Sequence, residues 1–135
     1  MKTRRKFISR LGGMAALLSL GGLARASERR LETQGEFFHV VFFWLIDESE
    51  EVSKRFEKEL RKFIGQVDVI KTSHIGKPAP TDRDVIDNTW SYSLILSFNS
   101  KKEQDHYQEH EAHLQFIENA SSLWKKVLVY DSIKT

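Results

Sequence analysis

The sequence predicts an α+β fold in which an antiparallel four-stranded sheet carries two helices on one face. Two observations support this prediction. Segments with the apolar period of strands and of helices follow one another in the order β-α-β-β-α-β over residues 37–133, and no internal repeat or low-complexity tract interrupts them. This order is that of the split β-α-β, ferredoxin-like arrangement.

The first 26 residues have the features of an export signal. Arg4 and Arg5 precede an aromatic and an apolar residue in TRRKFIS, a mildly apolar run follows over 11–23, and the small residues of ARA at 24–26 suit cleavage. The run of 13 residues has glycines at its ends and is shorter than the roughly 20 apolar residues that a membrane span needs. We therefore expect twin-arginine export to the periplasm without stable membrane insertion after cleavage. A flexible lead-in over 27–36 would precede the folded domain, 37–135.

The basic character of the chain resides in this signal. The chain has 21 basic and 19 acidic residues, and residues 1–26 hold six basic and no acidic ones, which leaves 15 against 19. A domain with a net charge of −4 lacks the basic surface that phosphates attract. Nucleic acid is therefore not an expected partner.

The first expected strand, FFHVVFFWLI at 37–46, is apolar on both faces. Helices on one side of the sheet cover only one of these faces. Leaving the other face in water forfeits roughly 1.5 to 3 kcal/mol for each large apolar side chain. We therefore expect a symmetric homodimer packed sheet on sheet.

The remaining elements are predicted from the period of the apolar residues and from the capping and turn residues between them. Asp47 or Ser49 can cap a helix that Gly65 ends, and its apolar stripe consists of Val52, Phe56, Leu60, Phe63 and Ile64. Strands are expected over 67–77 and 89–98, separated by a polar loop that holds both prolines. A second helix, capped by Asn99 or Ser100, precedes a last strand over 123–133.

Three of the five histidines lie within DHYQEHEAH, residues 105–113. On a continuous helix His106, His110 and His113 fall within about 60° of one another. Phe116 lies off this stripe, which indicates that the helix bends near residues 111–116. The spacing permits a zinc site, with His113 or Glu109 as third ligand, but there is no HExxH string, and we expect no metal. In a purely structural interpretation, His110 is a core histidine and His106 a solvated one.

The same residues carry a family resemblance. FFHVVFFWL, TWSYSLILSF, DHYQEHEAHLQF and WKKVLVYDSI together resemble the stress-responsive dimeric α/β-barrel family. The resemblance implies that two ferredoxin-like protomers pair into a barrel. It also implies chemistry without metal or organic cofactor, because a plant polyketide cyclase of the family acts through a tyrosine and a histidine that correspond to Tyr107 and His113. The early strand histidine of that enzyme corresponds to His39, and a further pocket histidine falls on Tyr92.

These observations lead to one expected site and two classes of function. We expect a small, mostly apolar pocket lined by His39, Tyr92, Tyr107, His110 and His113. In the first class the protein is a cofactor-independent cyclase, isomerase or monooxygenase acting on a small carbonyl or phenolic compound, with His113 as base and Tyr107 as oxyanion donor. In the second, a non-catalytic stress-response protein holds a small apolar or phenolic ligand in the same pocket.

Overall fold

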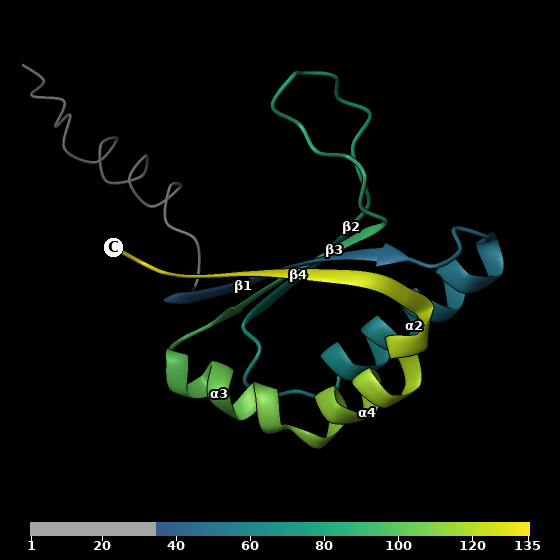
Figure 1. The fold of residues 1–135 in the computed structure, drawn as a ribbon. Coiled ribbons are helices and arrows are strands. Elements are labelled where there is room, and N and C mark those ends of the chain that lie inside the picture. The colour runs from purple at the N-terminus through teal and green to yellow at the C-terminus, as the bar shows by residue number, and fades with distance from the viewer. Residues whose placement is uncertain (1–34) are drawn as a thin grey trace, which may run out of the picture. The chain divides into compact units, whose positions relative to one another are not determined.

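The computed structural model describes residues 35–135, which form one antiparallel sheet with three helices on a single face (Figure 1). The strands are β1 (Phe37–Leu45), β2 (Thr72–Gly76), β3 (Tyr92–Phe98) and β4 (Trp124–Ile133), in the order β2-β3-β1-β4. The helices are α2 (Glu50–Ile64), α3 (Lys101–Glu109) and α4 (Glu111–Ala120), and a 3-10 turn, Ser121–Leu123, leads into β4. The ferredoxin-like prediction is confirmed.

The expected export signal, 1–26, and the lead-in up to residue 34 lie outside the described residues. Within residues 35–135, none of the helices combines the length and the apolar character that crossing a membrane requires.

The central strand β1 separates the two faces of the sheet. Its residues alternate strictly between buried and half-buried, and the buried positions face the helices. Residues of the other set, among them Phe38, Phe42 and Trp44, are only half-buried because α2, α3 and α4, the helices of residues 35–135, all lie on the opposite face. The expectation of burial on both faces therefore holds for one face of an isolated chain. The second face needs another cover.

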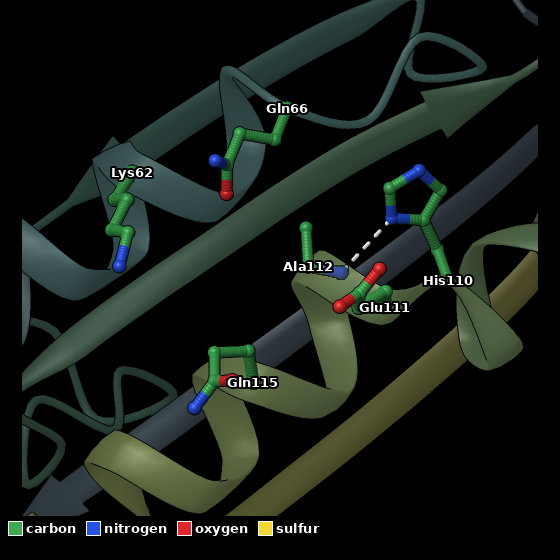
Figure 2. Close-up of a pocket in the computed structure, with 6 residues that line it drawn as sticks. All are labelled: Lys62, Gln66, His110, Glu111, Ala112 and Gln115. Atoms are coloured by element: carbon green, nitrogen blue, oxygen red, sulfur yellow. Dashed lines mark hydrogen bonds between the residues drawn. The ribbon is translucent and has the colours of Figure 1, made fainter.

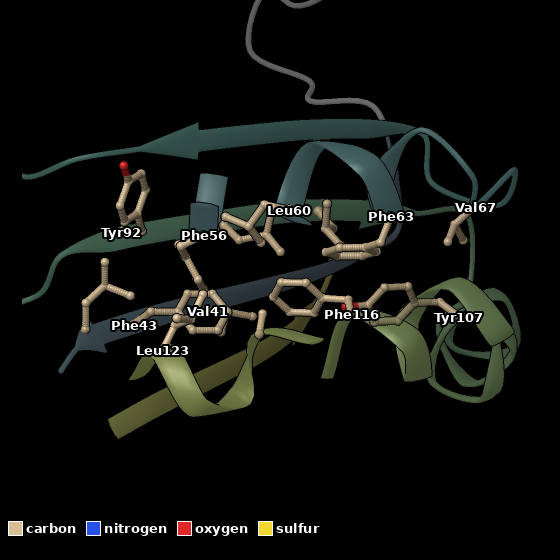
Figure 3. Close-up of a cluster of buried hydrophobic side chains, with 14 of the residues drawn as sticks. Val41, Phe43, Phe56, Leu60, Phe63, Val67, Tyr92, Tyr107, Phe116 and Leu123 are labelled. Carbon is tan, nitrogen blue, oxygen red and sulfur yellow. The ribbon is translucent and has the colours of Figure 1, made fainter. Parts of the chain in front are cut away.

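The core lies between the sheet and α2, and aromatic rings fill it (Figure 3). Ser49 caps α2 by accepting a hydrogen bond from the backbone nitrogen of Val52 at 3.4 Å, as predicted. Phe56 and Phe63 project from this helix and pack edge or tilted against Phe43 (5.0 Å between centroids) and Phe116 (4.7 Å). This packing holds the helices at a fixed distance from the sheet.

Two strands are shorter than predicted. The strand expected over 67–77 is paired only from Thr72, although Val67 before it is buried in the core. The strand expected over 89–98 begins at Tyr92 because Thr89 is held in a turn by Asp87, whose Oδ1 accepts from the Thr89 backbone nitrogen (2.9 Å) and hydroxyl (2.7 Å).

The second predicted helix is two helices, so the sheet carries three rather than two. His110 has an extended backbone (φ −65°, ψ 134°) that ends α3, and its Nδ1 accepts a hydrogen bond from the backbone nitrogen of Ala112 at 3.1 Å (Figure 2). The imidazole therefore serves as the N-cap of α4, in the manner of an asparagine. The sequence indicates a bend near residues 111–116, whereas the structure has a full break at His110, because the histidine spacing carries no sign of such a cap.

We predict that His110→Ala lowers the free energy of unfolding by about 1 kcal/mol, because it leaves the first turn of α4 without its side-chain cap. His110→Asn restores an acceptor and should recover most of this loss. Urea unfolding followed by circular dichroism measures both variants. Equal destabilisation by alanine and asparagine would contradict the capping role.

Candidate functional site

A cavity of about 190 Å³ lies between the helix-facing side of the sheet and the α3–α4 pair. Its polar lining comes from four residues on three elements, β1, α3 and α4, and its remaining walls are apolar. The polar group is His39, Tyr107, Gln108 and His113; the apolar group is Val41, Phe43, Leu94, Phe116, Ile117, Trp124, Val127 and Val129. The cavity is thus polar in one part and apolar elsewhere, as small-molecule sites usually are.

Tyr107 projects from α3 into the core, toward Phe116 (Figure 3). Its ring packs on His113 (4.4 Å between centroids) and edge-on against His39 (5.5 Å). No residue within 35–135 hydrogen-bonds its hydroxyl. Among the described residues, every fully buried side-chain oxygen or nitrogen has a hydrogen-bond partner. The unpartnered Tyr107 oxygen is therefore accessible to solvent. The hydroxyl is therefore available to the cavity.

Burial raises the pKa of the Tyr107 hydroxyl far above its ordinary value of 10.0, and the negative charge of Asp131 raises it further. The phenol therefore keeps its proton throughout the physiological range. It can donate a hydrogen bond to a ligand oxygen and is not suited to act as a base.

His39 stands on β1 directly opposite Asp131 of β4 in the antiparallel register. Its Nδ1 donates a hydrogen bond to Oδ1 of Asp131 at 2.6 Å. Because a carboxylate only accepts, Nδ1 carries the hydrogen and Nε2 keeps its lone pair in the neutral imidazole. The pairing also supplies the partner that a polar side chain on a buried strand face requires.

His113 lies in the first turns of α4, and its Nδ1 approaches the backbone carbonyl oxygen of Gln108 at 3.2 Å. The carbonyl can only accept, so this contact also leaves the lone pair on Nε2. Burial lowers the pKa of His113 below 6.5, the Gln108 carbonyl raises it, and His39 and His110 lower it again. The net effect keeps His113 neutral, as a general base must be.

Together the three groups bring a phenol donor and two imidazoles to one cavity, and the neutral His113 ring keeps an acceptor nitrogen. No lysine or arginine among residues 35–135 lines it, so these residues supply no fixed positive charge that would select an anionic ligand. The arrangement suits proton transfer at a neutral ligand that carries an oxygen.

The structure places Tyr92 and His110 outside this cavity, which corrects the predicted five-residue pocket. Tyr92 lies at the opposite end of the core from Tyr107 (Figure 3), and its hydroxyl donates weakly to the Ser53 carbonyl and Glu57 Oε2, both at 3.4 Å. It lines a separate cavity of about 370 Å³. The common pocket was predicted because a strand residue's position along the sheet is invisible in its alternation pattern.

His110 borders another hollow, of about 320 Å³, between the end of α2 and the start of α4 (Figure 2). Its Nδ1 is engaged in capping α4, while His106 is exposed on α3. In the part of the chain that the structure describes, no group of three or more histidine, cysteine, aspartate or glutamate side chains is placed to hold a metal. The zinc alternative therefore has no geometric support among these residues.

Asp131 and Gln108 were not predicted from the sequence. An acidic residue inside the apolar run of the last strand was a signal, because aspartate is depleted in strands. The backbone carbonyl of Gln108 left no signal, because its contact with His113 depends on the break between the helices.

Comparison with known proteins gives a family and a fold. The family model described as the stress responsive A/B barrel domain matches residues 37–134. No curated protein sequence matches the chain. A Dabb-family protein with a ferredoxin-like fold from Mesorhizobium loti superposes with a TM-score of 0.63 at 20% identity, covering 76% of this chain and 99% of the relative.

Two further solved structures show the same fold. A dimeric protein from Bacteroides fragilis has a TM-score of 0.58 at 18% identity, covering 76% of this chain and all of its own, 100%. A hydroxynitrile lyase from Passiflora edulis has a TM-score of 0.64 at 15% identity, covering 76% of this chain and 96% of the lyase.

We predict that His113→Gln flattens the dependence of stability on pH just below neutrality. Between the ordinary histidine pKa of about 6.5 and the lower pKa of folded His113, the unfolded chain binds a proton that the folded chain does not. Falling pH therefore destabilises the native protein through this residue. Urea unfolding at a series of pH values compares the two slopes, and identical slopes would show that the His113 pKa is not lowered by folding.

Proposed function

The chain belongs to the stress responsive A/B barrel domain family, and we propose that this member binds a small, neutral, oxygen-bearing compound and catalyses proton transfer beside its carbonyl group without a cofactor. The observation that carries the proposal is the meeting of Tyr107, His39 and His113 in one cavity. The reaction class is enolisation, which underlies isomerisation and ring closure of carbonyl compounds.

The roles follow from the protonation states of the groups. His113 Nε2 takes a proton from the carbon next to the carbonyl, and the C–H electron pair moves into the new C=C bond of the enolate. The Tyr107 hydroxyl donates a hydrogen bond to the enolate oxygen, where negative charge develops. The imidazolium then returns the proton to carbon or oxygen, which restores neutral His113. His39, oriented by Asp131, offers a second hydrogen bond to a hydroxyl of the ligand.

The size of the cavity limits the ligand. An apolar protein cavity of about 150 Å³ is enough to bind benzene, and this one measures about 190 Å³. It therefore suits a single ring with one or two small substituents. The apolar walls, including Phe43, Phe116 and Trp124, would contact the ring, and the polar part would contact its oxygen.

A non-catalytic ligand-binding protein is the second candidate. The family description names a stress response and no reaction, which favours this candidate. That a hydroxynitrile lyase shares the fold favours the enzyme. Both candidates use the same cavity and differ only in whether bound ligand exchanges a proton.

We also propose that a second copy of the chain covers the helix-free face of the sheet. Half-buried Phe38, Val40, Phe42 and Trp44 lie on this face beside Leu128 and Tyr130, and Tyr130 is 60% exposed. Solved relatives of the same fold are described as dimeric, which supports a homodimer. Isologous packing of this face would remove its large aromatic side chains from water.

The first test of function uses acetophenone, a single-ring ketone, as probe. In D₂O we expect the protein to accelerate exchange of the methyl protons for deuterium, followed by NMR. His113→Gln and Tyr107→Phe should each reduce this rate by about 100-fold or more, because the first removes the base and the second the oxyanion donor.

A matched pair of α4 variants shows whether the cavity is used. Ile117 lines the cavity and Leu114, one turn earlier, does not, so Ile117→Trp should block acetophenone binding and Leu114→Trp should leave it intact. Binding without accelerated exchange would favour the non-catalytic candidate. Acetophenone binding that persists in Ile117→Trp would place the ligand elsewhere and would contradict the proposed site.

Export through the twin-arginine pathway remains a proposal that rests on residues 1–26. We predict that replacing Arg4 and Arg5 together by lysine leaves the protein in the cytoplasm, because the arginine pair is the feature that this pathway reads. Cell fractionation measures the distribution, and because lysine keeps both positive charges, the double variant separates loss of the arginine pair from loss of charge. Periplasmic accumulation of the double variant would contradict twin-arginine export.

A further inference from the structure

Residues 77–91, here named the β2–β3 arm, connect two neighbouring strands by a long excursion. The arm rises from the sheet on the side opposite the three helices (Figure 1). Antiparallel neighbours can be joined by a turn of two to five residues, so most of this segment is not needed to connect β2 to β3. It occupies the side on which the proposed dimer places the second copy.

The base of the arm is built into the helix-free face. Trp90 packs edge-on against Phe42 at 5.1 Å between centroids, and its Nε1 donates to the backbone carbonyl of Asp87 at 2.8 Å. Trp44 Nε1 donates to the Thr89 hydroxyl at 3.0 Å. Phe42 and Trp44 both lie on the helix-free side of β1. These contacts fix the direction in which the arm leaves the sheet.

The same contacts join the arm to the apolar surface of the sheet. Phe42 touches Trp90 on one side and Tyr130 on the other, at 6.5 Å between centroids. The aromatic surface therefore runs without interruption from β4 across β1 to the foot of the arm. A partner seated on the sheet would meet the arm as part of the same surface.

Of the two neighbouring aliphatic side chains in the far part of the arm, Ile86 is half-buried and Val85 is almost fully exposed. Val85 is 89% exposed, and it follows Asp82, Arg83 and Asp84 in a polar stretch. A single exposed valine is unremarkable on most surfaces. This one stands on a segment that is tied at its base and directed to the side that a second copy would occupy.

We propose that the β2–β3 arm is a dimerisation arm that embraces the second copy of the chain and buries Val85 against it. The inference rests on the proposed sheet-to-sheet dimer and adds a contact that the flat face does not supply. By two-fold symmetry each protomer contributes one arm, so the contact occurs twice in the dimer. An arm whose base is held in place before binding loses less conformational freedom on association than an unattached loop would, which favours affinity.

The first test is the dissociation constant of the full chain, measured by sedimentation over a dilution series. Val85→Asp places a charge in the proposed contact twice per dimer and should raise the constant by about 10-fold or more. Leu114→Asp is the matched control, because this exposed leucine of α4 lies on the helix side of the sheet and should leave the constant unchanged. Tyr130→Asp tests the sheet face itself.

The outcomes separate the arm from the dimer. Dissociation by Tyr130→Asp with an unchanged constant for Val85→Asp overturns the arm and leaves the dimer standing. A chain that is monomeric at every concentration overturns both. Neither outcome bears on the cavity, which the acetophenone exchange tests separately.

A second test uses the absence of cysteine from the chain. A benzophenone maleimide on Val85→Cys should, on irradiation, yield a covalent pair of chains whose joined peptides mass spectrometry identifies. The same probe on Leu114→Cys should yield no such pair. Cross-links from Val85→Cys confined to its own chain would show that the arm folds over its own protomer, which overturns the proposal.

Discussion

The structure depends on the strict alternation of β1, which sends every second side chain into the helix-covered core. His39 falls on the buried set, between two apolar neighbours of the same face. A polar ring in that position requires a partner, and the register with β4 supplies Asp131. The opposite set, which includes Phe42 and Trp44, faces away from the three helices of residues 35–135 and forms the second, partly exposed face of the sheet. One constraint thus produces both the site and the surface proposed for dimerisation.

The break at His110 assembles the remainder of the site. In a continuous helix Tyr107 and His113, six residues apart, would point about 120° away from each other. The extended backbone of His110 turns the chain between α3 and α4, and the two rings then meet at 4.4 Å. It also frees the Gln108 carbonyl to receive the His113 Nδ1 hydrogen. A histidine that forms no part of the cavity therefore determines its chemistry.

Burial acts on these groups in one direction, toward their neutral forms. It raises the pKa of Tyr107 and lowers that of His113, so the phenol remains a donor and the imidazole an acceptor over the same pH range. A hydrogen-bond donor and a base that keep these roles over the same pH range are what enolisation requires.

The sequence by itself determined the order of elements, the cap and apolar stripe of α2, and three members of the cavity, His39, Tyr107 and His113. The period of apolar residues and the capping residues can both be recognised from neighbouring positions in the chain. The sequence indicated a bend near residues 111–116 but not the break at His110, since a histidine cap has no common signature. It also placed Tyr92 and His110 in a pocket that holds neither. Only the tertiary structure decided these points, together with the pairing of His39 with Asp131. Strand register and helix direction bring together residues far apart in the chain, and no local pattern records those distances.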